Sequence, residues 1–384
     1  MSRLFDPIFG TTAVAAATGD RAWLGALCEA EAALARACAR AGVIDLPTAL
    51  EIGAAGAELA GGDVGALGRG AVAGGNPVIP LVALLRERVR AQAGDHAAAA
   101  VHTGATSQDV LDTAMMLLAH RALAVVIAEL DGCAAATASL AREHRNTAMA
   151  GRTLLQQAVP TTFGALAAVW GAGLDRAVAG LNAVRAELPV QLGGAAGTLA
   201  TLHPHGLDVL TAFADELALA VPSGVWHTER GVVHQLAGAL GTAAASVAKV
   251  AGDVVLLAQT ELGELSEAAS GGSSSMAHKH NPIAAVTARA AALQAPGLVA
   301  TLLAAGAPEL QRGAGPWHAE WPALTALLRA AGGAASRLRV CLTGLRVDEA
   351  AMARNLNGLT ARTGDVDTGH AGELVDRYLA GRPS

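Results

Sequence analysis

The chain has 384 residues and a net charge of −6, with 52% hydrophobic and only 16% charged residues. This length suits two or three domains with a large core, and so apolar a composition predicts that much of the surface lies against other subunits. The charge creates no basic field, so we expect no nucleic-acid partner.

The N-terminal residues and the cysteines indicate a cytoplasmic location without a membrane partner. The opening sequence MSRLFDPIFG has no apolar core of the signal-peptide type. The four cysteines show neither a CxxC pair nor metal-like spacing, so we expect reduced thiols. Two uncharged stretches, 153–174 and 290–308, are interrupted by glutamines or proline, and we interpret them as buried helices and not as membrane spans.

Apolar residues recur at helical spacing over most of the chain, and strand-like alternation does not compete over any comparable length. Long helices are predicted over residues 23–42, 111–145, 163–187 and 229–268. Their many alanines allow close packing but give each helix little apolar area to bury, so many helices should associate in a bundle, in part across subunits. The pattern therefore predicts an all-α fold.

The segment HTGATSQDVLDTA, His102–Ala114, has the features of a helix N-terminus. Thr106 and Ser107 are candidate capping hydroxyls, and Asp109 is an acid in the first turn before a long apolar run. A well-capped structural helix would explain this pattern. The alternative is that the exposed amides and hydroxyls bind an anion such as a substrate carboxylate, which the nearby His102 supports.

The segment GRTLLQQAVPTTFG, Gly151–Gly164, precedes a helix predicted to follow Pro160. Gln156 and Gln157 are adjacent amides in an apolar setting and need hydrogen-bond partners. Structural partners and a bound substrate are equally good explanations for them.

The segment SGGSSSMAHKHNP, Ser270–Pro282, is a polar break between long helices. Its glycines permit mobility, its serines offer hydroxyls and amides, and Lys279 is one of only two lysines among 27 basic residues. We interpret it as a loop that closes over a substrate and delivers a serine, and not as a plain linker. His278 and His280 flank Lys279, whose charge disfavours a metal there, so we predict no metal site.

Together the three segments resemble the active-site blocks of the fumarase/aspartase superfamily, in the family's order. The family loop reads GSSxMPxKxNP, and this chain has GSSSMAHKHNP from Gly272 to Pro282. Within the superfamily, LFDPIFGTTAV, QLGGAAGTLATL, VWHTERG and RGAGPWHAEWPAL are similar to the bacterial 3-carboxy-cis,cis-muconate cycloisomerases. The resemblance covers most of residues 3–350.

The resemblance implies an all-α, fumarase/aspartase-like subunit of three domains. These would be an N-terminal helical domain over 1–105, a central long-helix bundle over 106–343 and a C-terminal helical domain over 344–384. It also implies a homotetramer whose active sites are shared between subunits and contain neither metal nor cofactor. Relatives continue through further helices after VDEAAMARNL, whereas this chain passes almost directly to DTGHAGELVDRYLA, so we expect a shortened C-terminal domain.

The implied reaction interconverts 3-carboxy-cis,cis-muconate and 4-carboxymuconolactone, in the protocatechuate branch of the β-ketoadipate pathway. A proton alpha to a carboxylate is transferred while a carboxylate of the same molecule adds to, or leaves, the next carbon. By position, Ser273 matches the family's proton-transferring serine, whose alkoxide the loop amides and Lys279 would stabilise. His102 matches a further catalytic position. Positions that match substrate-binding residues are Thr106, Ser107, Gln156, Asn281 and Arg312.

One departure from the family pattern bears on the leaving group. The family block GRTH reads Gly151-Arg152-Thr153-Leu154 here, and the missing histidine assists the leaving group in many relatives. Hydroxide or an amine leaves badly without a proton, whereas a carboxylate, with a conjugate-acid pKa of about 4, needs none. Leu154 therefore favours lactonisation over an adenylosuccinate- or argininosuccinate-type lyase reaction, which stays as the alternative. A non-catalytic homologue is a third hypothesis, because Ala277 replaces the loop proline and the C-terminal domain is short.

Overall fold

The computed structural model describes residues 4–9, 12–268, 271–272, 276, 279–364 and 367–382. In chain order its elements are α1 (Asp6–Phe9), α2 (Thr12–Ala17), α3 (Asp20–Arg40), α4 (Leu46–Leu59), α5 (Val64–Gly74), α6 (Val78–Ala99), α7 (Ser107–Glu143), β1 (Ala148–Thr153), β2 (Gln156–Thr162), α8 (Phe163–Ala186), the 3-10 helix η1 (Ala200–Leu202), α9 (Gly206–Leu217), α10 (Gly231–Leu257), β3 (Leu265–Glu267), β4 (Gly271–Gly272), β5 (His280–Asn281), α11 (Ile283–Ala292), α12 (Ala295–Ala304), α13 (Pro316–Thr343), β6 (Leu345–Val347), α14 (Glu349–Thr363) and α15 (Ala371–Gly381).

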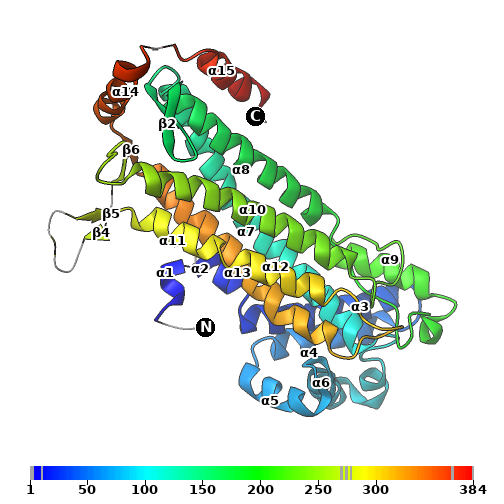
Figure 1. Ribbon diagram of the computed structural model, residues 1–384. Coiled ribbons are helices and arrows are strands. Elements are labelled where there is room, and N and C mark those ends of the chain that lie inside the picture. The colour runs from blue at the N-terminus through cyan, green and yellow to red at the C-terminus, as the bar shows by residue number, and fades with distance from the viewer. Residues whose placement is uncertain are drawn as a thin grey trace.

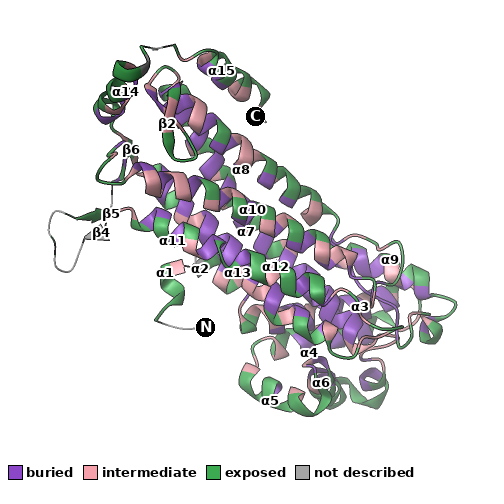
Figure 2. Ribbon diagram, viewed as in Figure 1, coloured by how far each residue is buried: buried purple, intermediate pink, exposed green. Residues whose placement is uncertain are grey.

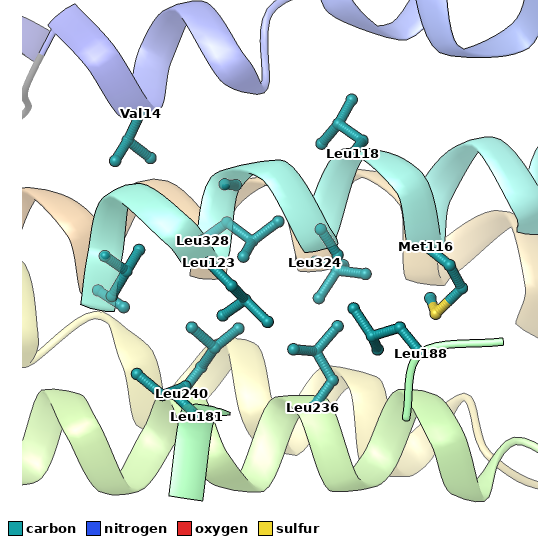
Figure 3. Packing of buried hydrophobic residues seen from close by; sticks show 14 of the residues in the cluster. Val14, Met116, Leu118, Leu123, Leu181, Leu188, Leu236, Leu240, Leu324 and Leu328 are labelled. Carbon is teal, nitrogen blue, oxygen red and sulfur yellow. The ribbon is translucent and has the colours of Figure 1, made fainter. Parts of the chain in front are cut away.

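Helices α7, α8, α10 and α13 lie side by side and form a central bundle, with α11 and α12 continuing along one side (Figure 1). Helix α7 has 37 residues and therefore spans roughly 55 Å. Figure 2 shows the buried residues of these helices facing one another and the exposed residues on their outer sides. Leu123 of α7, Leu240 of α10 and Leu328 of α13 point into the same core, and each is at most 1% exposed (Figure 3). The predicted all-α bundle is confirmed.

The helix predicted over residues 229–268 is too long. Helix α10 ends at Leu257, and the chain turns at Gly263, whose φ of 60° lies in the left-handed region. Glu264 follows and is fully buried, where it accepts hydrogen bonds from the Arg152 guanidinium at 2.7 and 2.9 Å. Strand β3 then pairs antiparallel with β6. Contacts with distant parts of the chain thus override the helical preference of this segment.

A β-hairpin, β1–β2, lies between α7 and α8, so the stretch 153–174, interpreted above as a buried helix, is strand and turn as far as Thr162. Its two-residue turn is Leu154-Leu155, with φ of 50° and 64°, a turn in which asparagine and glycine are usual. Gly151 lies at an irregularity in the strand pairing, and a Cβ there would be 2.7 Å from the carbonyl oxygen of Val159. Helix α8 then begins at Phe163, as predicted.

The N-terminal helices α3 to α6 gather at one end of the bundle, whereas the β1–β2 hairpin, α14 and α15 lie toward the other (Figure 1). Helix α15 returns to pack against α8. Asp175 of α8 accepts hydrogen bonds from Tyr378 Oη at 3.1 Å and from Arg382 Nε at 3.2 Å. Asp376 accepts two more from Arg145, at 2.6 and 2.8 Å. The C-terminal helix is therefore docked on the central bundle.

Three of the described helical stretches are long and apolar enough to cross a membrane, judged by length and composition alone. The apolar window of Ser107–Glu143 is 78% buried within the chain, as expected for the bundle core. The windows of Gly231–Leu257 and Ile283–Ala304 are only 44% and 39% buried. Helices α10, α11 and α12 therefore present apolar surface that this chain leaves uncovered.

Candidate active site

The start of α7 has the capped geometry that the sequence predicts. Thr106 is the N-cap residue with extended backbone angles, and Ser107 is the first helical residue. The Asp109 carboxylate accepts a hydrogen bond from the Thr106 amide at 2.9 Å. Thr106 and Ser107 are both partly exposed, so the positive end of the α7 dipole faces accessible space.

Asp109 ties a distant loop to this helix start. Its carboxylate is 1% exposed and accepts hydrogen bonds from the backbone amides of Gly193 and Gly194, both at 2.9 Å. His227 Nε2 lies 2.6 Å from the same carboxylate. The acid therefore joins two other segments of the chain, the 193–194 loop and the segment of His227, to the start of α7 that it caps.

Arg312 also lies beside the start of α7, although it is 204 residues from Gln108 in the sequence. Its guanidinium donates to Gln108 Oε1 at 3.1 Å and to the carbonyl oxygen of Ala195 at 3.0 Å. Gln108 is fully buried and also donates to the carbonyl oxygen of His227 at 2.8 Å. Arg312, predicted to bind substrate, thus lies beside the α7 N-terminus that carries Thr106 and Ser107.

His102 completes this group from the turn before α7. Its Nδ1 lies 2.6 Å from Glu31 Oε1, and the Glu31 side chain is 1% exposed. Burial of the ring lowers its pKa, but the charge of Glu31, their hydrogen bond and the charge of Asp109 outweigh burial, so the pKa of His102 is raised. Glu31 was not predicted from the sequence, where its only signal is an acid within the alanine-rich buried stripe of α3.

A buried ionic cluster supports the same end of α7. Arg230 donates to Asp112 at 2.8 Å and to Glu320 at 2.9 Å, and all three side chains are at most 1% exposed. Trp317 Nε1 donates to Asp112 at 2.9 Å. Burial raises the pKa of Glu320, although its hydrogen bond to Arg230 and the charge of Arg230 oppose this shift. The sequence offered no motif for this cluster, because its members are far apart in the chain. Asp112 lies in α7, Arg230 is the N-cap of α10, and Trp317 and Glu320 lie in α13.

The second predicted block lies at the opposite end of the bundle. Arg152 is held by Glu264, whose other bond is from Asn355 Nδ2 at 2.7 Å. Gln157 finds structural partners on α14: it donates to the Asn355 carbonyl oxygen at 3.3 Å and accepts from Arg362 at 2.6 Å. Gln156 is exposed at the tip of the hairpin. Of the two adjacent amides, Gln156 is therefore the one available for a ligand.

The third predicted block is described only in part. Ser273, Ala277 and His278 lie outside the described residues. Lys279 is exposed, and Asn281 is partly buried in β5, which pairs with β4. Another buried acid, Glu267, binds the start of α11, which follows β5. Its carboxylate accepts hydrogen bonds from the backbone amides of Ala285 at 2.7 Å and Ala284 at 3.0 Å.

The predicted site residues therefore form two separate groups within one chain. His102, Thr106, Ser107 and Arg312 lie at the start of α7. Gln156 lies in the hairpin that follows the end of α7, and Lys279 and Asn281 lie near that same end of the bundle (Figure 1). The length of α7, roughly 55 Å, separates the first group from the hairpin.

Comparison with known proteins supports the predicted fold. The lyase family matches residues 14–297. The 3-carboxy-cis,cis-muconate cycloisomerase of Bradyrhizobium diazoefficiens is 45% identical over 93% of this chain and 80% of its own length. The nitrosuccinate lyase of Streptomyces davaonensis is also 45% identical, over 93% of this chain and 77% of its own. The solved 3-carboxy-cis,cis-muconate lactonizing enzyme from Pseudomonas putida has a TM-score of 0.88 and 36% identity, covering 99% of this chain and 87% of that one.

Proposed function

Because the chain belongs to the lyase family of the fumarase/aspartase superfamily, we propose that it is a 3-carboxy-cis,cis-muconate cycloisomerase. It interconverts that tricarboxylate and 4-carboxymuconolactone, in the protocatechuate branch of the β-ketoadipate pathway. The observation that carries this proposal is the 45% identity to a cycloisomerase over 93% of the chain. The substrate is a small polycarboxylate, in keeping with a helix N-terminus and an arginine grouped around accessible space.

The leaving-group argument supports the same reaction. Leu154 lies in the hairpin turn with its side chain 97% exposed, so this position offers no proton to a departing group. A carboxylate leaves the ring without one, since its conjugate acid has a pKa of about 4. An amine, as in adenylosuccinate or argininosuccinate, needs protonation. The lyase alternative is therefore less well supported than lactonisation.

The residues of the two groups have complementary roles in this proposal. In lactone formation, a carboxylate oxygen of the substrate adds to the double bond, and the electron pair of that bond moves to the carbon alpha to a second carboxylate. The Ser273 hydroxyl donates its proton to this carbon. Lys279 and Asn281 stabilise the charge that accumulates on the second carboxylate before protonation. His102 is a further catalytic residue that contacts a substrate carboxylate, and Thr106, Ser107, Gln156 and Arg312 bind the substrate carboxylates.

We further propose that the enzyme is a homotetramer with active sites shared between subunits. The separation of the two residue groups along α7 supports this, because a second copy must supply what one chain keeps at its other end. The uncovered apolar surface of α10, α11 and α12 supports subunit contact over a membrane partner in a cytoplasmic enzyme. Residues 1–105, 106–343 and 344–384 remain the predicted domains of each subunit.

Mixing two inactive variants tests the sharing of sites directly. Ser273→Ala changes the third sequence block and Arg312→Ala changes the group at the start of α7, and each should lose activity as a homotetramer. Refolding the two together should produce mixed tetramers in which some sites are intact, so part of the activity should return. Activity that never returns in tetramers shown by mass spectrometry to be mixed would contradict shared sites.

The reaction itself is tested by adding 3-carboxy-cis,cis-muconate and following the loss of its ultraviolet absorbance, with the lactone identified by NMR. Ser273→Ala should lower turnover by orders of magnitude while circular dichroism stays unchanged. A folded wild-type tetramer that leaves the muconate unchanged and consumes adenylosuccinate would overturn the proposal. Equal behaviour of wild type and Ser273→Ala would favour a non-catalytic homologue.

A second candidate reaction is elimination from nitrosuccinate, favoured by the equal 45% identity to the Streptomyces davaonensis lyase. Nitrite, like a carboxylate, is a weak base that leaves without a proton, so Leu154 does not separate the two reactions. A colorimetric assay for nitrite release separates them. Nitrite release at a higher kcat/KM than muconate conversion would make this the principal activity.

A further inference from the structure

A buried carboxylate faces His102 from a helix outside all three sequence blocks. Glu31 lies on α3, and its Oε1 is 2.6 Å from His102 Nδ1. The Glu31 side chain is 1% exposed and the His102 side chain 13%. Glu31 Oε2 is also buried and has no hydrogen-bond partner among the described residues. The direct contact of this buried acid is therefore with the imidazole.

The turn that carries His102 is held by its surroundings. His102 has a φ of 65°, in the left-handed region that few non-glycine residues adopt. Thr103 Oγ1 donates to the carbonyl oxygen of Ala100 at 2.7 Å. Gly104, with a φ of 75°, lies so close to Leu202 that a Cβ there would be 2.2 Å from its Cγ. Such a conformation persists when the packing around it leaves no alternative.

We propose that Glu31 is a positioning residue, which holds a proton on His102 Nδ1 and thereby presents Nε2 to a substrate carboxylate. This inference rests on the proposed function, because it concerns how His102 acts in the same site. The Nδ1 bond to Glu31 fixes both the ring orientation and the nitrogen that carries the proton. Nε2 has no partner among the described residues and is not one of the buried polar atoms, so it is the ring atom open to a ligand.

The charged groups around the ring come from three helices. Burial lowers the pKa of His102, Glu31 of α3 and Asp109 of α7 raise it, and Arg86 of α6 opposes them, with a raised pKa as the result. A larger share of the ring is therefore imidazolium near neutral pH. The imidazolium donates from Nδ1 to Glu31 and from Nε2 to a carboxylate oxygen of the substrate. Loss of Glu31 should weaken substrate binding, and more so as the pH rises.

The variant Glu31→Gln removes the charge and keeps the size of the side chain. Its matched control is Glu29→Gln, because Glu29 lies on the same helix, is 40% exposed and pairs with Arg121 at 2.8 Å. With 3-carboxy-cis,cis-muconate, Glu31→Gln should raise KM several-fold at neutral pH, because without the Glu31 charge a smaller share of His102 is imidazolium. The change in kcat should be smaller. The decline of kcat/KM with rising pH should begin at lower pH, whereas Glu29→Gln should match wild type.

A double variant tests whether Glu31 acts through His102. If it does, Glu31→Gln combined with His102→Asn should lose no more activity than His102→Asn alone. Independent, additive losses would overturn the proposal, because they would give Glu31 a role that does not pass through the imidazole.

The pairing is also measurable without turnover. Diethylpyrocarbonate modifies the neutral imidazole, so the rate of His102 modification against pH, followed by peptide mass mapping, reports the pKa of that ring. The midpoint should fall in Glu31→Gln and stay unchanged in Glu29→Gln. Should Glu31→Gln not fold, Glu31→Asp withdraws the carboxylate and should also lower the midpoint. An unchanged midpoint in a folded Glu31 variant overturns the proposal, whereas a shifted midpoint in a protein that leaves the muconate unchanged overturns only the proposed function.

Discussion

At the residue scale, the candidate carboxylate site is built on buried charge. Arg230 lies between Asp112 and Glu320, and this cluster carries one more negative than positive charge when all three are ionised. Burying charges costs desolvation energy that only close pairing offsets. The cluster is therefore sensitive to loss of its single cation, Arg230. Asp112 belongs to α7, so the cluster supports the start of that helix.

Removing that cation should be strongly destabilising. Arg230→Leu leaves two buried carboxylates unpaired and should lower the free energy of unfolding by about 3–5 kcal/mol. Arg339→Leu is the control, since its guanidinium is half exposed and 3.4 Å from Glu129, and should cost less than about 1 kcal/mol. Urea unfolding at fixed protein concentration measures both. Similar costs for the two variants would contradict the assigned role of the cluster.

The pH dependence of stability should report Glu320. Burial raises the pKa of this acid in the folded protein, so the folded state binds its proton more tightly than the unfolded state does. The stability that this proton contributes is present below the unfolded pKa and is lost as the pH rises through the folded pKa. The stability of wild type relative to Glu320→Gln should therefore decline as the pH rises above about 4. A relative stability that rises over that range would show that Arg230 dominates instead.

Sequence motifs pointed to the candidate site residues but not to the residues that hold them in place. Thr106, Ser107 and Arg312 come together as the resemblance implied, because the loop of Gly193 and Gly194 is tied to the α7 start. Glu31 could not be predicted, since one acid in an alanine-rich helix has no pattern of its own. Its contact with His102 forms only in the folded chain, where α3 packs beside the turn before α7.

At the element scale, periodicity predicted helices better than it predicted where they end. The run after Leu257 still contains residues that favour helices, so nothing local stops α10. Burial of Glu264 against Arg152 and the pairing of β3 with β6 end it, and both are contacts with distant segments. The β1–β2 hairpin was not predicted for a different reason. Its turn residues, Leu154 and Leu155, are not typical of turns.

The docking of α15 on α8 depends on the absence of a side chain at Gly171 of α8. A Cβ at Gly171 would lie 2.0 Å from Tyr378 Oη and 2.5 Å from its Cζ. Gly171→Ala should therefore displace α15, lower the melting temperature and expose the C-terminal helix to proteases. Gly180→Ala on the same helix has nothing within 4 Å of the new Cβ and should instead stabilise by about 0.5–1 kcal/mol. If both variants resist limited proteolysis equally, the Tyr378 contact does not hold α15.

At the scale of the whole molecule, one chain keeps its candidate site residues in two places. The long α7 separates His102, Thr106, Ser107 and Arg312 from the β1–β2 hairpin, and the helices beside it expose apolar surface. Low charge and abundant alanine indicated this surface from composition alone. The separation of the two groups was not readable from composition, because it depends on the three-dimensional path of each helix.

A charge on the exposed apolar surface should therefore abolish activity without touching any site residue. Leu303 of α12 is 52% exposed, and Leu303→Glu should dissociate the oligomer because burying that carboxylate between subunits is unfavourable. Leu50→Glu is the control, because Leu50 is 57% exposed and lies on α4, outside the apolar surface of α10, α11 and α12. Light scattering gives the mass, and the muconate assay gives the activity. If the sites are shared as proposed, separated chains are inactive, so monomeric Leu303→Glu with wild-type kcat/KM would show that a single chain suffices.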